Sequence, residues 1–464
     1  MSNQKIDSLK SDLLSLLSDP SSLITEEEKL QALSKDEWFV SAMPQLALEP
    51  SNAQEVASIL AYAHQHAIAL TTRGAGYGYV GGATPIHGGI LLSTARLNKI
   101  LQIHPGDAIA IVEPAVITGQ LAEAVRQEGL FYPPDPASLH HCSIGGNIAT
   151  NAGGPRCLKY GVTRHYVLGL QVALATGELV EVGGRTHKNK TGFDLVGMFV
   201  GSEGLLGVIT QATLRLLPRP PARAMLSAGF ENMQEAAQAV QSIFSAGYLP
   251  SAVEVADHFT LKAAREDLPK NFQQHIPPGK AHLLLEVDGQ EASVISEIEG
   301  LKNILDTSAL QVEKALGESS CDFLWALRRS FSMALRATGL IKLNEDIVVP
   351  RSRLCDLVAF TERLQAESGF PIACFGHAGD GNIHVNIMIP AQEKEQQQEK
   401  IDLLLEKLFQ QVIQWKGAIT GEHGIGLAKL PWWKMATSPQ VRSLHRALKS
   451  ALDPHHILNP GKFV

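Results

Sequence analysis

Two histidines in one short segment have the spacing of metal ligands. His377 and His384 lie in residues 375–386, on either side of a turn rich in glycine and aspartate. A strand–turn–strand arrangement would bring both imidazoles to the same end of a sheet. Asn386 comes two residues after His384 and would share its strand face.

A second segment, residues 417–426, adds a carboxylate and a third imidazole. Glu422 and His423 are adjacent there and are surrounded by glycines. Two imidazoles and one carboxylate suit Zn²⁺, Mn²⁺ or Fe²⁺ and leave positions open for water or substrate. A histidine pair alone would be ordinary at a protein surface, but the two segments together favour a metal site.

Glycine is concentrated in one part of the chain. Of 40 glycines, 24 lie between Gly74 and Gly207, whereas glycine makes up only about 7% of average proteins. Because tight turns and close contacts between backbone and ligand require glycine, we expect a large ligand to lie on this stretch of main chain. The glycines and other small residues form three clusters, at residues 73–83, 142–154 and 199–210.

The first cluster contains a G-x-G-x-x-G pattern at Gly76, Gly78 and Gly81. A Rossmann site needs a helix to begin within this motif. Residues 82–89 contain three glycines and a proline and cannot form that helix, so we reject a Rossmann site. What remains is a set of backbone N–H groups suited to a pyrophosphate, with a plain glycine-rich hairpin loop as the alternative.

Helices and strands that would position these residues follow from hydrophobic periodicity. In the first half we predict a helix over 54–63 that begins with a capping box at Ser51, strands over 67–72, 89–93, 109–113 and 207–217, and a helix over 118–129. In the second half we predict helices over 232–246, 322–338 and 394–415, and strands over 281–287, 346–349 and 385–389. The predicted fold class is α+β, with a helix-covered antiparallel sheet in the second half.

A proline-rich stretch at residues 218–221 ends the strand over 207–217 and marks the main domain boundary. We expect four parts: an N-terminal helical segment, a glycine-rich domain, a domain that carries the histidine motif, and a C-terminal segment. Their predicted bounds are 1–39, 40–220, 221–430 and 431–464.

Composition narrows the class of protein. The 464 residues include 40 Lys and Arg against 47 Asp and Glu, a formal net charge of −7, which argues against a nucleic-acid partner. The five cysteines contain no C-x-x-C pair, which argues against an iron–sulfur cluster or a cysteine-based zinc site. Without a long apolar run or a signal-peptide pattern, we expect a cytoplasmic protein, with a peripheral position at the membrane as the alternative.

In this order, the three clusters resemble the FAD-binding (PCMH-type) domain of the vanillyl-alcohol-oxidase, or p-cresol methylhydroxylase, superfamily. Within it, the chain is similar to the D-2-hydroxy-acid dehydrogenases that act on D-lactate, glycolate and D-2-hydroxyglutarate. The resemblance runs over roughly residues 40–464 and includes the terminal Asn-Pro-Gly-Lys at 459–462. It implies a two-subdomain FAD-binding fold followed by a substrate, or cap, domain, with a C-terminal segment over 431–464 that returns to the FAD-binding domain.

The resemblance implies that the first loop binds the pyrophosphate of FAD, the second cluster lines the ribityl chain and isoalloxazine, and the third contacts the adenine side. Ala75 and Tyr77 replace a glycine and a threonine of the family's usual first loop, which removes a hydroxyl but keeps the backbone donors. No histidine lies in that loop, so non-covalent FAD is expected. The implied cofactor-binding residues are Arg73, Gly74, Ala75, Gly76, Tyr77, Gly78, Gly82, Pro134, Asp135, Ser138, Ser143, Gly145, Gly146, Asn147, Thr150, Gly153, Glu203, Gly204, Gly207, Ile209 and Asn459.

The same resemblance makes His377, His384 and Glu422 the ligands of a divalent metal, zinc first and manganese or iron as alternatives. It makes His423 the proton acceptor. Oxidation of a 2-hydroxy acid removes the hydroxyl proton and moves a hydride from carbon to flavin N5. A metal on the hydroxyl oxygen lowers its pKa, a neutral histidine takes the proton, and FAD accepts the hydride.

The carboxylate of such a substrate needs a cation. The resemblance assigns this role to Arg328, which can bind a carboxylate through two parallel hydrogen bonds, and to Lys342. Ser332, one helical turn from Arg328, would assist, and Asn386 would complete the substrate-binding set.

The implied function is the oxidation of a D-2-hydroxy acid to the 2-oxo acid. D-lactate is the first choice of substrate and glycolate the second. D-2-hydroxyglutarate or D-malate comes third, because no second cationic cluster for a distal carboxylate stands out. Electrons would pass to an external acceptor, namely an electron-transfer flavoprotein, an iron–sulfur subunit, a cytochrome or a quinone. A flavin subunit of a larger electron-transfer complex and a non-flavin metal-binding module are the competing classes, and a homodimer stays open.

Overall fold

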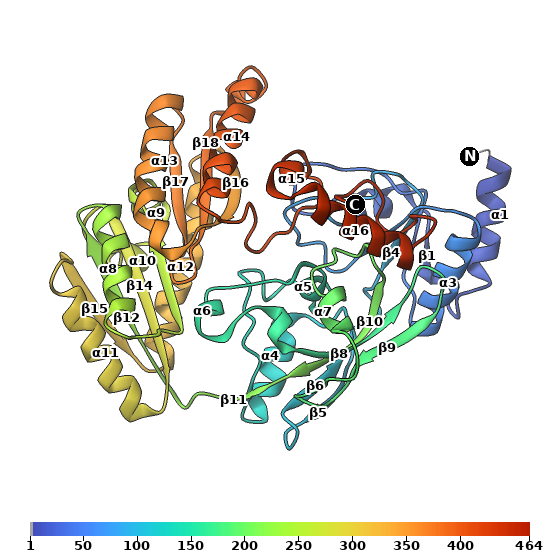
Figure 1. Ribbon diagram of the computed structural model, residues 1–464, viewed down its shortest axis with the longest axis horizontal. Coiled ribbons are helices and arrows are strands. Elements are labelled where there is room, and N and C mark those ends of the chain that lie inside the picture. The colour runs from blue at the N-terminus through green and yellow to red at the C-terminus, as the bar shows by residue number, and fades with distance from the viewer. Residues whose placement is uncertain (1–2) are drawn as a thin grey trace. The chain divides into compact units, whose positions relative to one another are not determined.

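The computed structural model describes the backbone of residues 3–464 and the side chains from residue 8 onward. The chain forms two compact units (Figure 1). Unit 1 comprises Met1–Gly153, Val162–Arg219 and Glu422–Val464, and unit 2 comprises Gly154–Gly161 and Pro220–Gly421. Both units combine helices with sheets, which confirms the predicted α+β class.

Unit 1 contains a four-stranded sheet in the order β1-β2-β4-β3 and a five-stranded sheet in the order β5-β6-β10-β8-β9; a short pair, β11-β7, lies apart. The strands are β1 (Leu23–Ile24), β2 (Leu46–Leu48), β3 (Leu70–Arg73), β4 (Ile90–Ser93), β5 (Ile100–His104), β6 (Ile109–Val112), β7 (Leu130–Phe131), β8 (Val167–Ala173), β9 (Leu179–Gly183), β10 (Val208–Arg215) and β11 (Leu217–Pro218). The helices are α1 (Asn3–Leu14), α2 (Glu27–Leu33), α3 (Ala53–Gln65), α4 (Thr118–Gln127), α5 (Ile144–Thr150), α7 (Leu195–Phe199), α15 (Leu430–Ala436) and α16 (Pro439–Leu452).

The start of α3 differs from the prediction. Asn52, and not Ser51, is the N-cap, and its side chain accepts the backbone N–H of Glu55 at 2.9 Å. The backbone N–H of Ser51 instead donates to the Glu55 carboxylate at 2.7 Å, and the Ser18 hydroxyl donates to the same carboxylate. Serine and asparagine cap helices about equally well, so residue type alone does not distinguish Ser51 from Asn52.

Unit 2 is built on one antiparallel sheet in the order β15-β12-β14-β13-β17-β18-β16. Its strands are β12 (Ala222–Phe230), β13 (Ala252–Ala256), β14 (Ala281–Gly289), β15 (Gln311–Leu316), β16 (Ile341–Val348), β17 (Ile372–His377) and β18 (Asn382–Ile389). Its helices are α6 (Cys157–Tyr160), α8 (Met233–Ser245), α9 (His258–Asp267), α10 (Lys270–Gln273), α11 (Glu291–Leu305), α12 (Glu318–Ala337), α13 (Leu354–Ser368) and α14 (Gln398–Gln414). The helix-covered antiparallel sheet is confirmed, although the strand predicted over 346–349 begins earlier, at Ile341.

Helices pack against this sheet in two groups (Figure 1). α9 and α12 contact each other and the sheet, while α8 contacts α11 and α13. Phe331 and Leu335 of α12 form a core with Ala373 and Phe375 of β17 and Met388 of β18. Because alternate residues of a strand share a face, this core identifies the face of the sheet that α12 covers.

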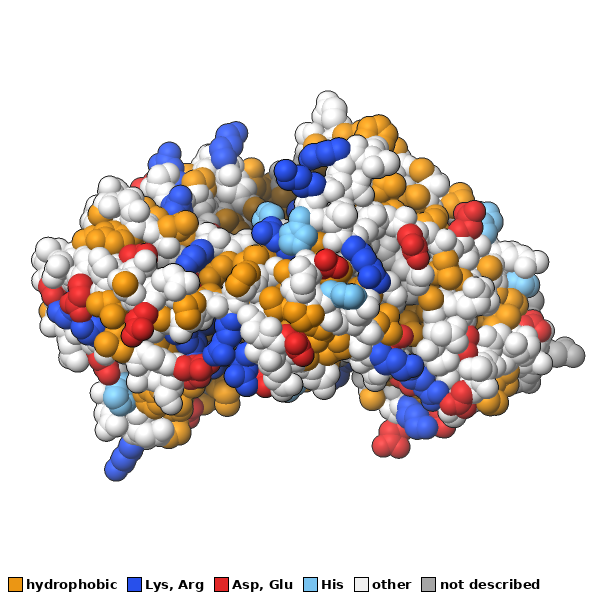
Figure 2. All heavy atoms as spheres, turned by 90° about the horizontal axis from the view of Figure 1, so that it is seen from below, with side chains coloured by type: hydrophobic (Ala, Val, Ile, Leu, Met, Phe, Trp, Pro, Cys, Tyr) orange, Lys and Arg blue, Asp and Glu red, His pale blue; other side chains and the backbone are white. Residues whose placement is uncertain are grey.

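The surface is mixed in character. On the face drawn in Figure 2, acidic and basic side chains are interspersed, with apolar side chains between them. Within residues 3–464, every helix is either too short or too polar to cross a lipid bilayer.

Candidate functional site

The predicted histidine hairpin lies in unit 2. β17 ends at His377 and β18 begins at Asn382, directly opposite it in the register. The rings of His377 and His384 lie with centroids 5.8 Å apart, and both residues are 8% exposed. The strand–turn–strand arrangement is thereby confirmed, and it brings the two imidazoles together as the spacing predicts.

A buried aspartate fixes the segment that leads to Glu422. Asp346 of β16 is fully buried, and its carboxylate accepts the side-chain amide of Asn382 at 2.7 Å, the Thr420 hydroxyl at 3.0 Å and the Gly421 backbone N–H at 2.9 Å. Gly421 is the last residue of unit 2 along the chain. Asp346 therefore ties the last residues of unit 2 to its own sheet.

His377, His384 and Glu422 each offer one ligand atom within 4.8 Å of the other two. Two imidazoles and one carboxylate are a donor set that a zinc, manganese or ferrous ion accepts. These residues could hold such an ion, and the side chains present fit it chemically.

Two cations flank an aromatic ring on the face of the unit 2 sheet that carries His377 and His384. Arg328 of α12 stacks over Phe375 at 4.8 Å from its centroid, and the Nζ atom of Lys342 lies 5.9 Å from it. Lys342 donates a hydrogen bond to the Ser332 hydroxyl at 2.8 Å. Burial, together with the positive charge of Arg336, lowers the pKa of Lys342 to about 8. Arg328, Ser332 and Lys342 thus lie close together in unit 2.

Several polar atoms on this face are buried but not satisfied by the protein. Among the residues that the structure describes, Nε of Arg328 and the side-chain oxygens of Asn344 and Asn386 have no hydrogen-bond partner. The amide nitrogen of Asn386 is engaged by the backbone oxygens of Ala373 and His384, both at 3.0 Å. Since a buried polar atom without a partner is costly, these atoms fit a polar ligand that would contact them.

In unit 1, the first two glycine clusters come together at the start of α5. Ser143 caps this helix and also accepts the backbone N–H of Ala75 at 3.3 Å. A Cβ atom added to Gly74 would lie 2.8 Å from the Ser143 hydroxyl, and one added to Gly145 would lie 2.5 Å from Pro114. Close packing therefore requires glycine at position 145, while at position 74 the Ser143 hydroxyl would have to move. The backbone N–H groups of Ala75, Gly145 and Gly146 already donate hydrogen bonds within the protein.

Asn459 joins the third cluster to the first. Its amide donates to the backbone oxygens of Gly82 at 3.0 Å and Glu203 at 2.8 Å. The Glu203 carboxylate accepts the backbone N–H groups of Ile425 and Gly426, both at 2.8 Å. Glu203 therefore holds the segment that follows His423, a role that the sequence did not suggest.

Other predicted cofactor residues have internal contacts in unit 1. The Asn147 amide donates to the Thr118 hydroxyl at 2.7 Å inside the protein. Tyr77, another predicted cofactor residue, stacks on His141 with ring centroids 4.9 Å apart. His423, the predicted proton acceptor, lies beside Tyr79 with ring centroids 5.1 Å apart.

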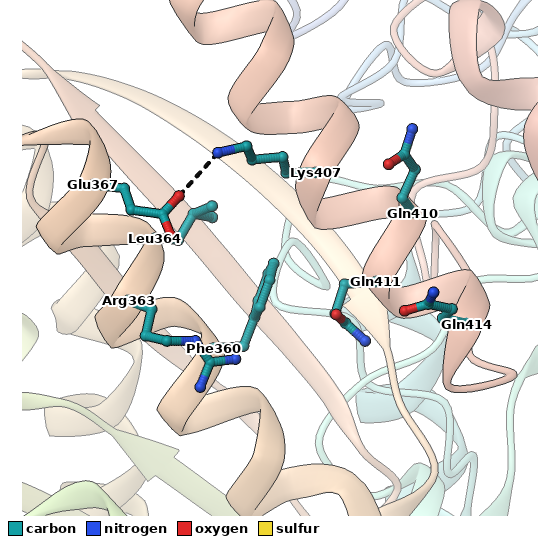
Figure 3. A pocket seen from close by; sticks show the side chains of 8 residues that line it. All are labelled: Phe360, Arg363, Leu364, Glu367, Lys407, Gln410, Gln411 and Gln414. Carbon is teal, nitrogen blue, oxygen red and sulfur yellow. Dashed lines mark hydrogen bonds and ion pairs between the residues drawn. The ribbon is translucent and has the colours of Figure 1, made fainter.

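A surface pocket of about 260 Å³ lies elsewhere in unit 2, between α13 and α14 (Figure 3). An ion pair between Lys407 and Glu367, 2.9 Å long, crosses it. Its lining contains none of the predicted site residues. The lining residues are Phe360, Arg363, Leu364, Glu367, Lys407, Gln410, Gln411 and Gln414.

One residue of the unit 2 face was missed. Glu254 of β13 contacts both His377 and Arg328. A single glutamate in an apolar strand carries no signal in the sequence, because its partners lie far along the chain.

Two family matches decide where the chain belongs. The FAD binding domain family matches residues 44–183, and the C-terminal domain family of FAD linked oxidases matches residues 219–463. The chain belongs to the FAD-linked oxidases. The resemblance seen in the sequence is thereby confirmed, and the FAD-binding domain supports FAD as the cofactor.

This FAD-linked oxidase is 38% identical to the glycolate oxidase subunit GlcD of Bacillus subtilis over 91% of the chain and 89% of that protein. It is 31% identical to the D-lactate dehydrogenase of Anaerostipes hadrus over 96% of the chain and 94% of that protein. Its fold is similar to that of a 4-ethylphenol oxidase from Gulosibacter chungangensis, with a TM-score of 0.79, 20% identity, and coverage of 100% of this chain and 98% of the other.

Proposed function

We propose that this FAD-linked oxidase oxidises a small D-2-hydroxy acid to the 2-oxo acid, with D-lactate as the first choice of substrate, and that it uses a divalent metal, zinc first. The observation that carries the proposal is the face of the unit 2 sheet where two imidazoles and two cations converge. A hydroxyl and a carboxylate on neighbouring carbons need these two kinds of group close together.

Arg328 and Lys342 would bind the substrate carboxylate. Arg328 has an unsatisfied Nε, and its guanidinium carbon lies over the ring of Phe375. A guanidinium can bind a carboxylate through two parallel hydrogen bonds. Lys342 adds a point charge, oriented by Ser332.

His377, His384 and Glu422 would hold the metal. A bound divalent ion lowers the pKa of a coordinated hydroxyl group. His423 would take the hydroxyl proton, as a positioned histidine can near neutral pH. FAD, bound without a covalent link by the glycine clusters of unit 1, supplies the hydride-accepting chemistry.

Glycolate is the second candidate substrate, and the similarity to a glycolate oxidase subunit favours it. That relative is named as a subunit, which supports transfer of electrons to a partner in a larger assembly. An electron-transfer flavoprotein, an iron–sulfur subunit, a cytochrome or a quinone could accept them.

A panel of substrates tests the proposal. Under anaerobic conditions, FAD-loaded protein is mixed with D-lactate, L-lactate, glycolate, D-malate or D-2-hydroxyglutarate. The loss of flavin absorbance at about 450 nm is then followed. D-lactate should bleach the flavin fastest and L-lactate should not bleach it. Faster bleaching by glycolate would select the second candidate, and no bleaching by any of the five would refute the proposal.

A further inference from the structure

A buried carboxylate in unit 2 stands opposite one of the proposed metal ligands. Glu254 is 1% exposed and pairs with His377 in the register of β13 and β17. Residues opposite each other in a sheet share a face. Burying a carboxylate costs free energy unless charged or polar groups contact it. The groups that contact Glu254 therefore indicate its role.

The two oxygens of Glu254 contact different elements. Oε1 lies 2.5 Å from Nδ1 of His377. Oε2 forms an ion pair of 2.7 Å with Nη2 of Arg328, which reaches it from α12. One carboxylate therefore connects a proposed metal ligand with a proposed substrate-binding cation.

The contact with His377 determines which ring nitrogen carries the proton. A carboxylate accepts from an N–H group, so the proton stays on Nδ1 and the lone pair lies on Nε2. A carboxylate on the far nitrogen also fixes the ring orientation and raises the basicity of the ligating nitrogen.

The contact with Arg328 restrains a long side chain. Glu254 holds one end nitrogen, and the guanidinium carbon lies over the ring of Phe375, 4.8 Å from its centroid. A guanidinium fixed in this way presents its remaining donors in one orientation, which matches the planar geometry of a carboxylate.

We propose that Glu254 is a positioning residue that sets the tautomer of His377 and the orientation of Arg328 together. This inference rests on the proposed function and adds a dependence between its two parts, since the loss of one carboxylate weakens both the metal site and the binding of the substrate carboxylate.

The same sheet provides a matched control. Glu286 of β14 is also 1% exposed and also bridges charged and polar groups. It binds Arg156 at 2.7 and 2.9 Å and the Trp325 indole N–H at 2.6 Å. None of these partners belongs to the proposed site, so Glu286→Gln reports the effect of an altered buried ion pair alone.

The experiment compares FAD-loaded full-length wild type, Glu254→Gln and Glu286→Gln. Zn²⁺ affinity is measured by competition with a chromophoric chelator, and KM and kcat are measured with D-lactate. Glu254→Gln should bind Zn²⁺ about 10–100-fold more weakly, the range seen when the partner of a metal-bound histidine is lost. It should also raise KM about tenfold or more with its FAD content unchanged, while Glu286→Gln keeps wild-type Zn²⁺ affinity and KM.

Equal Zn²⁺ affinity in wild type and Glu254→Gln would overturn this inference and leave the proposed function standing. So would a loss of Zn²⁺ affinity in Glu286→Gln as large as that in Glu254→Gln. A wild type that binds no Zn²⁺ would overturn both the inference and the metal part of the proposed function. If Glu254→Gln does not accumulate with FAD, Glu254→Asp replaces it. The charge is then kept but the carboxylate is one methylene shorter, and weakened Zn²⁺ binding is again expected, while unchanged binding overturns the inference.

Discussion

The cofactor region of unit 1 and the sheet face of unit 2 are built in different ways. Around Gly145, close packing leaves no room for a side chain, and small residues and backbone groups contact one another directly. On the unit 2 face, charged side chains such as Arg328 and Lys342 are held by specific neighbours. Added atoms should therefore damage the first region, and removed charges should damage the second.

The largest expected effect comes from removing the proposed base. His423→Ala should lower kcat by about 10²–10⁴-fold, the contribution of a positioned acid–base group, and should leave FAD and zinc content unchanged. Steady-state kinetics with metal analysis checks this. His66→Ala removes a histidine stacked on Tyr62 and serves as the control. Loss of zinc in the His423 variant would instead make that residue a ligand.

The second largest effect is expected from removing the charge of Lys342. Lys342→Met should raise KM for D-lactate roughly 10–100-fold, because a hydrogen bond to a charged group contributes about 1.5–3 kcal/mol, while FAD content stays constant.

The pKa of Lys342 adds a pH dependence. Because burial lowers this pKa to about 8, the side chain is cationic below that pH and loses its charge above it. KM of the wild type should therefore rise between about pH 7 and pH 9, and KM of Lys342→Met should change less over the same range. If KM of the wild type and KM of Lys342→Met changed equally with pH, Lys342 would not be the titrating cation that binds the substrate carboxylate.

A single methyl group tests unit 1. Gly145→Ala places a Cβ atom 2.5 Å from Pro114, and such overpacking costs about 1–3 kcal/mol. We expect roughly tenfold weaker FAD binding, measured by flavin fluorescence after dilution. Gly106→Ala adds a methyl group where no atom lies within 4 Å and should bind FAD as wild type does.

The smallest effect is expected at Ser332. Ser332→Ala removes the hydroxyl that orients Lys342 and should raise KM about two- to tenfold. Ser330→Ala removes a hydroxyl that bonds only the backbone of Leu327 at 2.6 Å. Equal KM values in the two variants would mean that the Ser332 hydroxyl has no part in binding.

The histidine hairpin could be predicted because all of its determinants are local. The turn residues between His377 and His384 and the apolar alternation around them lie within one short segment. The α+β class follows in the same way from periodicity and turn residues. The N-cap of α3 was misplaced by one residue, because serine and asparagine cap helices about equally well and both Ser51 and Asn52 have a glutamine or glutamate three residues later.

The contacts that the sequence could not predict join distant parts of the chain. Glu254 and His377 are 123 residues apart, and Arg156 and Glu286 are 130 apart. Arg156 lies in residues 154–161, which belong to unit 2 although they fall inside the first half of the sequence. No periodicity encodes such pairs, since each residue alone resembles an ordinary surface charge or strand residue.

The most direct test of the account is an anaerobic titration of FAD-loaded, metal-free protein with D-lactate. The account predicts that the flavin stays oxidised until Zn²⁺ is added and is then bleached, and that His384→Ala stays yellow under the same conditions. Full bleaching of a sample shown by elemental analysis to contain no divalent metal would contradict it.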